Sequence, residues 1–174
     1  MKRLSGQDQL FLSIETPDWH QHIAGMTIFD VSETPDFSFE RAVERLEERL
    51  ALAPKFTWRL RNVPFGLDRP GWVEDEHFDI SRHVRRVGAP RPGGRKEVAD
   101  LIGQIMTTQH NRRIPLWEYW YIDGLANDRV ASVLKFHHAL LDGVAGASLA
   151  TVLADLAPDA PTPEVPDDLP KAGR

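Results

Sequence analysis

The sequence predicts an α/β fold of the α+β type, in which helices flank a mixed sheet with antiparallel pairs. Helix and strand patterns alternate along residues 5–156, and residues 116–139 have the pattern of a strand hairpin. The 174 residues are 41% hydrophobic and 27% charged, as in an average soluble domain. A chain of this length buries roughly 70% of its unfolded surface, so one hydrophobic core can stabilise it.

The first elements follow from capping residues and apolar spacing. We expect a short helix over Ser5–Ile14, capped by Ser5, and a strand over His22–Val31. Residues 39–53 predict an amphipathic helix ended by Pro54, with one apolar and one charged face. The apolar face comprises Val43, Leu46, Leu50 and Ala53; the charges predicted to face solvent are Glu40, Arg41, Glu44, Arg45, Glu47, Glu48 and Arg49.

The later elements follow from alternation, glycines and turn residues. Residues 55–63 alternate as a strand, and residues 72–87 contain one or two further extended segments. Gly93 and Gly94 lead into a helix with an apolar stripe of Val98, Leu101, Ile102, Ile105 and Met106. The hairpin over residues 116–139 turns at residues 126–128 (Ala-Asn-Asp), and a last helix is expected over Gly143–Leu156.

The composition changes sharply near the C-terminal end of the sequence. Five prolines fall between residues 158 and 170, with four acidic residues among them. Such a segment buries little apolar surface and is extended. We therefore expect a domain over residues 1–157 and a linker or tail over residues 158–174.

Charge, cysteine content and hydropathy exclude several classes of protein. The net charge of −5 argues against nucleic acid as a partner. The sequence contains no cysteine, which excludes disulfides, zinc–thiolate sites and thiol nucleophiles. The seven histidines lack metal-ligand spacing, so no metal site is predicted. No signal peptide or transmembrane run is visible. We expect a cytoplasmic protein, with a peripheral position at the inner membrane or on lipid inclusions left open.

The segment with the clearest chemical potential is His137-His138-Ala139-Leu140-Leu141-Asp142-Gly143, where a strand pattern meets a helix pattern. Adjacent side chains of a strand point to opposite faces, so at most one of His137 and His138 should meet a substrate. Asp142 can hold the turn by capping or by pairing with an arginine, and Gly143 leaves space beside the imidazole. A neutral imidazole placed so is suited to act as general base on a hydroxyl.

Other catalytic patterns are missing from the sequence. There is no GxSxG elbow for a covalent nucleophile, and Gly93-Gly94 fits neither glycine-rich phosphate-binding pattern. Paired catalytic carboxylates are not indicated either. By elimination, the simplest chemistry is base-assisted direct transfer to an acceptor hydroxyl.

Three further segments accompany the histidines and make the sequence resemble a known family. HHALLDG is similar to the HHxxxDG motif of the CoA-dependent acyltransferase superfamily. LSGQDQLFL at residues 4–12, PLWE at 115–118, and FDI with HVR at 78–85 resemble the wax ester synthase/acyl-CoA:diacylglycerol acyltransferase family of bacteria. The resemblance implies one half of a two-domain fold like that of chloramphenicol acetyltransferase. It also implies long-chain acyl transfer from acyl-CoA to diacylglycerol or a fatty alcohol, without a cofactor.

The resemblance also implies roles for individual residues. His138 would remove the proton of the acceptor hydroxyl, and His137 would support the site. Asp142 would maintain the loop, paired with an arginine for which Arg59, or Arg61 on the same strand, is the candidate. Pro115, Leu116 and Trp117 would bind substrate along the acyl channel or stabilise the fold.

Two features depart from the family pattern. The family commonly has Leu-Asp-Arg before PLW, whereas this chain has His110-Asn111-Arg112, so a salt bridge from position 111 is not expected. Family members also have two halves of similar size with the active site between them, whereas this sequence covers one. We therefore expect a C-terminal half as a second polypeptide, and an apolar surface on this chain that it covers.

Two alternatives remain open from the sequence. A condensation-type acyltransferase with another acceptor shares HHxxxDG, although the PLW and SGQDQLFL segments disfavour it. A half-domain without catalysis that binds a lipid surface is of another class. The six cations between Arg82 and Lys96 could meet anionic headgroups, the phosphates of CoA, or only solvent.

Overall fold

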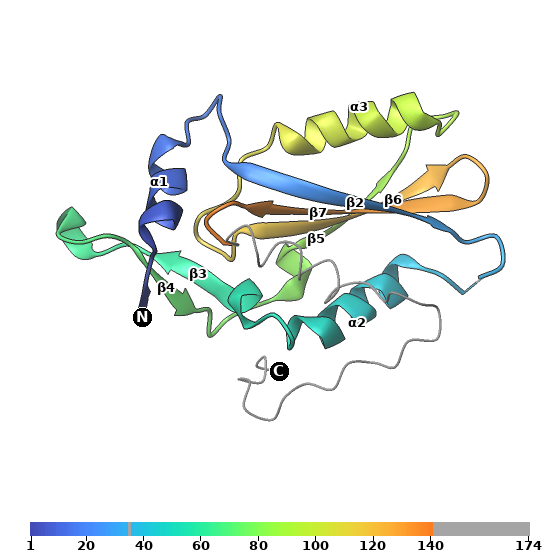
Figure 1. The fold of residues 1–174 in the computed structure, drawn as a ribbon. Helices are drawn as coiled ribbons and strands as arrows, with labels where there is room; N and C mark the ends of the chain where they lie inside the picture. Colours follow the sequence, from blue (N-terminus) through green and yellow to red (C-terminus); the bar gives the residue numbers. More distant parts are fainter. Residues whose placement is uncertain (35, 141–174) are drawn as a thin grey trace.

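The computed structural model describes residues 1–34 and 36–140, which form three helices and seven strands (Figure 1). The helices are α1 (Gly6–Ile14), α2 (Phe39–Leu50) and α3 (Arg95–Met106). The strands are β1 (Lys2–Arg3), β2 (His22–Asp30), β3 (Trp58–Arg61), β4 (Gly71–Glu74), β5 (Val84–Gly88), β6 (Trp117–Leu125) and β7 (Arg129–His137).

The main sheet has four strands in the order β2-β7-β6-β5. β7 pairs antiparallel with β2 and β6, and β5 pairs parallel with β6, so the sheet is mixed as predicted. The predicted hairpin is β6–β7. Asn127 and Asp128 both have positive φ, at 61° and 49°, which is the backbone of a tight hairpin turn. Asparagine and aspartate tolerate that conformation better than other non-glycine residues.

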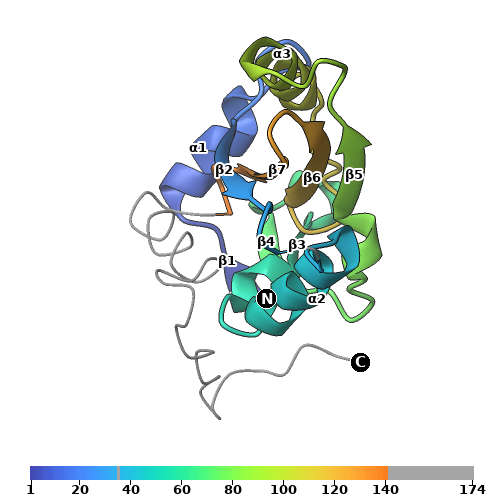
Figure 2. The ribbon, with the colours of Figure 1, turned by 90° about the vertical axis from the view of Figure 1, so that its right-hand side faces the viewer.

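Two layers cover the faces of the main sheet. In Figure 2, α3 lies on one face, and α2 and a second sheet lie on the other. This second sheet has the order β1-β4-β3, and the sequence did not predict it as separate. The larger hydrophobic core lies on the face of the main sheet that the second sheet covers, and it contains Leu50, Phe56, Leu116 and Trp117. The smaller core lies between the main sheet and α3 and includes Ile105, Ile122 and Val133.

The structure corrects three predictions about residues 39–63: the end of the helix, the bounds of the strand and the exposure of Arg49. The helix α2 ends at Leu50, and Pro54–Thr57 form a 3-10 turn before β3 begins at Trp58. Proline suits the first turn of a helix, and the Thr57 hydroxyl donates to the Pro54 carbonyl at 2.9 Å. Arg49, predicted to face solvent, is only 1% exposed. It lies three residues after Leu46 and beside Leu50, which places it at the buried stripe of α2.

The remaining predicted helices and strands of the described region are confirmed. Ser5 caps α1 by accepting from the Asp8 N–H, and the Asp8 carboxylate accepts from the Ser5 N–H, which makes a capping box. No helix among residues 1–34 and 36–140 is long and apolar enough to cross a bilayer. The predicted helix Gly143–Leu156 and the boundary between residues 157 and 158 lie outside the described residues.

We predict opposite effects of alanine at two glycines. Gly93 has φ 75°, and a Cβ there would lie 2.2 Å from the Gly124 carbonyl oxygen. Gly93→Ala should therefore lower the free energy of unfolding by about 2 kcal/mol or more. Gly103, inside α3, has nothing within 4 Å of its Cβ position. Gly103→Ala should raise the free energy of unfolding by up to about 1 kcal/mol. Urea unfolding followed by tryptophan fluorescence measures both, and equal effects would contradict the prediction.

Candidate active site

The two adjacent histidines stand where β7 ends in the middle of the main sheet. The His137 N–H donates to the Leu116 carbonyl at 3.0 Å, and the His138 N–H donates to the Gln21 carbonyl at 2.9 Å. These two bonds tie the strand end to both neighbouring chain segments. The Leu140 N–H then donates back to the His137 carbonyl and closes a turn. The backbone that carries the histidines is therefore held on both sides.

His137 points into the protein, and its side chain is fully buried. Its Nδ1 accepts a hydrogen bond from the Ala139 N–H at 3.0 Å, which leaves the ring proton on Nε2. Nε2 faces the Glu15 carboxylate at 3.6 Å. Burial lowers the pKa of His137 to about 4, although the Glu15 charge opposes the shift and Arg112 reinforces it. His137 is therefore a neutral imidazole at pH 7, with both nitrogens directed at groups of the protein.

Glu15 is a member of the site that sequence reasoning missed. Its side chain is 1% exposed, and Arg112 Nη2 donates to it at 2.6 Å. The Gln21 N–H donates to its other oxygen at 3.3 Å. Burial alone would raise the pKa of Glu15, but the Arg112 hydrogen bond, the His137 ring and the Gln21 N–H together lower it. The only local signal was an acidic residue just beyond the end of α1, which matches no motif.

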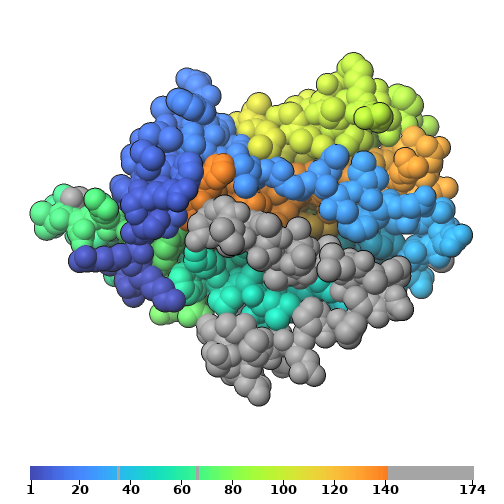
Figure 3. Space-filling view, viewed as in Figure 1, coloured from blue at the N-terminus to red at the C-terminus, as the bar shows by residue number. Residues whose placement is uncertain are grey.

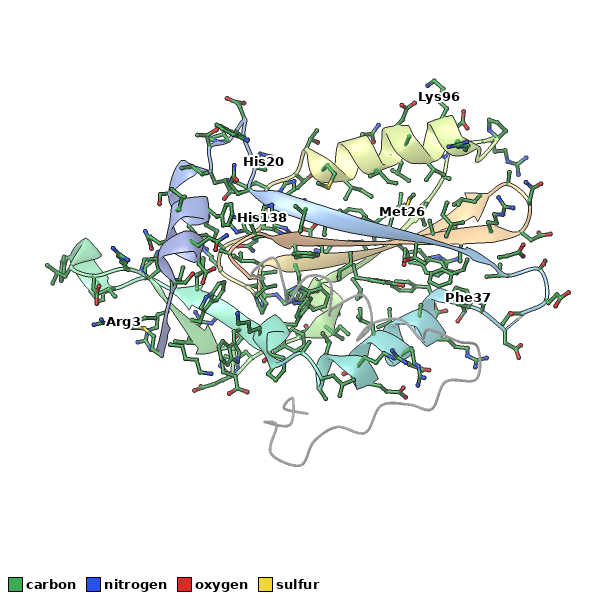
Figure 4. All side chains as sticks on the ribbon, viewed as in Figure 1. Arg3, His20, Met26, Phe37, Lys96 and His138 are labelled. Carbon is green, nitrogen blue, oxygen red and sulfur yellow. The ribbon has the colours of Figure 1, made fainter. Side chains whose placement is uncertain are left out.

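His138 occupies a different environment, as the alternation of strand side chains predicted. Its side chain is half-buried, and its ring stacks on Phe11 of α1, with centroids 4.7 Å apart and planes 17° apart. Figure 4 shows His138 at the end of the sheet beside α1. No protein group among residues 1–34 and 36–140 is recorded as a hydrogen-bond partner of its ring. Within the described region, the ring of His138 is therefore the more exposed of the two histidine rings.

The predicted Pro115–Trp117 segment is wholly buried. Trp117 Nε1–H donates to the Phe56 carbonyl at 2.7 Å, and the Trp117 carbonyl accepts from His83 Nδ1–H at 2.9 Å. The His83 ring stacks on the indole at 4.4 Å. Because Leu116 accepts the His137 N–H, this segment shapes the site through its backbone and its packing. Direct contact of these three residues with substrate stays a prediction.

Further titratable groups are buried behind His137. Lys135 is fully buried; its ammonium donates to the Ile105 carbonyl at 3.0 Å and to the Thr108 carbonyl, with Glu118 at 3.5 Å. Burial lowers the pKa of Lys135. His110 lies near it, and burial together with the Lys135 charge lowers the pKa of His110 to about 2. This face of β7 therefore favours neutral imidazoles.

The remaining predicted site residues are only partly described. Asp142 and Gly143 lie outside the described residues, so the predicted partner of Arg59 does too. Within the described region Arg59 pairs with Asp75 at 3.4 Å. Residues 1–34 and 36–140 contain no group of three or more histidine or acidic side chains that could hold a metal ion.

A pocket of about 150 Å³ lies beside α1, on a different face of the helix from the one that carries Phe11. Arg112 connects it to the site, because the guanidinium that lines the pocket also bonds Glu15. The other lining residues come from α1 and from the β3–β4 segment: Gln9, Leu12, Ser13, Leu60, Asn62 and Pro70.

Comparisons with known proteins identify the family to which this chain is similar. The profile of one protein family, described as the wax ester synthase/diacylglycerol acyltransferase catalytic domain, matches residues 4–174. A protein of Mycobacterium tuberculosis H37Rv, provisionally named a diacylglycerol O-acyltransferase, is 44% identical over 166 residues. That alignment covers 94% of this chain and 33% of the relative, so the chain spans about a third of the relative's length.

Solved structures show the same fold. The wax ester synthase/diacylglycerol acyltransferase of Marinobacter aquaeolei VT8 superposes with a TM-score of 0.75 at 32% identity. The match covers 86% of this chain and 37% of that one. The first condensation domain of the calcium-dependent antibiotic synthetase gives 0.66 at 14% identity over 87% of this chain and 37% of that domain's chain. At that identity the likeness concerns the fold alone.

We predict that the protein loses stability as the pH falls from 7 to 5. His83, His110 and His137 all have pKa values lowered mainly by burial, so the unfolded chain binds protons near pH 6.5 while the folded chain does not. Each such group costs up to about 1.4 kcal/mol per pH unit below 6.5. The free energy of unfolding should fall by at least about 2 kcal/mol. Urea unfolding at pH 7 and at pH 5 measures this change. His110→Gln removes one of the buried histidines and should make the free energy of unfolding less dependent on pH.

We also predict that the Glu15 ion pair contributes far more to stability than a surface pair. Glu15→Ala leaves the Arg112 guanidinium without its carboxylate and should cost about 2 kcal/mol or more. Arg45 and Glu48 make an exposed pair at 2.9 Å on α2, so Glu48→Ala should cost under about 0.5 kcal/mol. Urea unfolding compares the two variants. If both variants lose a similar free energy of unfolding, the Glu15 pair contributes no more to stability than a surface pair.

Proposed function

Because the chain belongs to the wax ester synthase/diacylglycerol acyltransferase family, we propose that it forms the part of an O-acyltransferase that carries the catalytic base. The donor is a long-chain acyl-CoA, used as a substrate with no further cofactor. The acceptor is the hydroxyl of diacylglycerol, which gives a triacylglycerol, or of a fatty alcohol, which gives a wax ester. The names of the relatives support the substrate class, and the geometry of the described residues supports the choice of the base.

The observation that carries the proposal is the contrast between the two histidines. His137 is buried, and its nitrogens face the Ala139 N–H and the Glu15 carboxylate. His138 follows it directly, points to the opposite face of the strand and stacks on Phe11 of α1. A general base must be fixed in orientation and still reach the proton that it removes. The half-buried ring of His138 stacked on Phe11, against the fully buried ring of His137, supports His138 as the base.

The proposed reaction is a direct transfer. The unprotonated ring nitrogen of His138 takes the proton of the acceptor hydroxyl as the oxygen attacks the thioester carbonyl carbon. The new C–O bond forms, the C–S bond breaks, and the CoA sulfur leaves with the electron pair. The imidazolium of His138 then returns the proton to that sulfur, so the base is regenerated without an acyl-enzyme.

The other residues of the site position His138. Glu15 and Arg112 hold His137, and the Leu116 and Gln21 carbonyls hold the backbone of the two histidines. Asp142 would keep the following turn in shape, and Gly143 would leave space for the substrate beside the ring. Pro115, Leu116 and Trp117 form the packed wall beneath the strand end.

The rest of the enzyme is proposed to lie against this chain. The relatives are about three times as long, so the other wall of the substrate site would come from the sequence that they have beyond this alignment. Met26 and Ile28 on the edge strand β2 are 49% and 50% exposed, and Leu10 on α1 is 54% exposed. These side chains form a candidate contact surface for such a second polypeptide.

The test is CoA release from a long-chain acyl-CoA with diacylglycerol, with a fatty alcohol and without acceptor, using the chain together with any partner that co-purifies. Because the chain has no cysteine, a thiol reagent detects released CoA without a background from the chain itself. His138→Ala should lower acceptor-dependent release by at least about 100-fold. His77 is an exposed histidine far from β7 in the sequence, and His77→Ala is the matched control.

Equal rates for His138→Ala and His77→Ala would exclude His138 as the base. Release that does not depend on any acceptor would indicate a hydrolase instead of a transferase. The acceptor that supports the faster release would identify the physiological reaction as triacylglycerol or wax ester synthesis.

A further inference from the structure

The loop between β3 and β4, residues 62–70, carries the most exposed large apolar side chains of the described region. We call this segment the β3–β4 tip. Phe65 is 97% exposed and Leu67 is 81% exposed. Figure 1 shows the tip projecting beyond the end of the molecule, and Figure 3 shows it as a separate lobe beside the body. Two neighbouring apolar side chains at a projecting loop indicate a contact with something apolar outside the chain.

The backbone of the tip supports this interpretation. Phe65 has φ 60° and ψ 11°, in the left-handed region that bulky residues rarely adopt. Such a conformation costs energy, and Phe65 gains almost no burial within the chain to offset it. A strained residue that contributes no packing to its own fold is more easily explained by a contact made elsewhere.

The charge around the tip indicates which kind of surface it meets. Residues 1–3 and 61–71 carry four cations, Lys2, Arg3, Arg61 and Arg69, against one carboxylate, Asp68. Arg3 approaches Asp68 at 3.7 Å, and its side chain is 89% exposed. This cationic end belongs to a chain whose net charge is −5. Apolar side chains surrounded by lysine and arginine are typical of segments that lie in an anionic lipid interface.

The basic run from Arg82 to Lys96 is a weaker candidate for the same contact. Arg86 is paired with Asp123 at 2.8 Å, and Lys96 is paired with Asp100. In Figure 4, Lys96 lies on α3, on the opposite side of the main sheet from Arg3 at the small sheet. The run also lacks an exposed large apolar side chain comparable with Phe65.

We propose that the β3–β4 tip inserts Phe65 and Leu67 into an anionic lipid surface, while Lys2, Arg3, Arg61 and Arg69 bind the headgroup phosphates. The segment docks this chain on the lipid phase that would hold an acyl acceptor. Asn62 and Pro70 at the base of the tip line the pocket that Arg112 shares with Glu15. The contact therefore lies at the same end of the molecule as His137 and His138.

The first experiment is co-sedimentation with vesicles of phosphatidylcholine containing 30% phosphatidylglycerol, and with vesicles of phosphatidylcholine alone. The wild-type chain should bind the anionic vesicles more tightly, by about fivefold for each engaged cation. Phe65→Ser with Leu67→Ser should weaken binding by at least about tenfold. Trp19→Ser removes a large apolar side chain that is 66% exposed in the segment between α1 and β2, and it is the control variant. It should leave binding within about twofold of wild type.

The second experiment locates the inserted residue. Because the chain lacks cysteine, Leu67→Cys gives a single site for a polarity-sensitive fluorophore. Its emission should shift to the blue with anionic vesicles and be quenched by bromine on the lipid chains. The same fluorophore at Gln104→Cys, exposed on α3, should show neither change.

Three outcomes would overturn the proposal. They are absence of wild-type binding to anionic vesicles, equal binding by the tip variant, and an aqueous spectrum from position 67 in the bound chain. A tip-dependent dimer in size-exclusion chromatography without vesicle binding would show that the tip contacts protein. None of these readouts involves acyl transfer, so they separate this proposal from the proposed reaction.

Discussion

The buried carboxylate of Glu15 is the interaction on which the geometry of the site depends. A carboxylate at 1% exposure is tolerated only where charge and hydrogen bonds compensate its lost hydration. Here the Arg112 guanidinium, the Gln21 N–H and the His137 ring provide that compensation. Moving any of the three away would remove part of that compensation. The end of α1, the start of β2 and the end of β7 are therefore held together, and the ring of His138 is directed out of the core as a consequence.

Predictions from the sequence were right where the cause of a structure is local. Ser5 caps α1 through its own side chain, and Asn127 with Asp128 provides the left-handed turn of the β6–β7 hairpin. They were wrong where the cause lies elsewhere in the fold. Arg49 was assigned to solvent because it continues a charged run, but α2 packs against the larger core through Leu46 and Leu50, and Arg49 beside them is 1% exposed. The division of the extended segments into two sheets depends on β1 pairing with β4, about 70 residues away, which no local pattern reveals.

The candidate site shows the same difference between local causes, which the sequence reveals, and contacts between distant segments, which it does not. Strand alternation was enough to predict that His137 and His138 occupy different environments, because the period of two belongs to the backbone. It could not predict Glu15, whose importance arises from Arg112, 97 residues later. Nor could it show that Arg59 has Asp75 as a partner, since that pair joins the two sides of a hairpin. An isolated acidic residue in a sequence is an ordinary surface residue until its partners are known.

The position of α1 connects the proposed base with the proposed lipid contact. One face of this nine-residue helix presents Phe11 to the His138 ring, and another lines the pocket beside the base of the β3–β4 tip. A helix with its side chains is only about 10 Å across. An acceptor with long apolar chains could therefore leave those chains at the lipid surface while its hydroxyl approaches His138. Such an arrangement avoids the cost of moving a whole diacylglycerol or fatty alcohol into water, which rises by about 0.8 kcal/mol for each exposed CH₂.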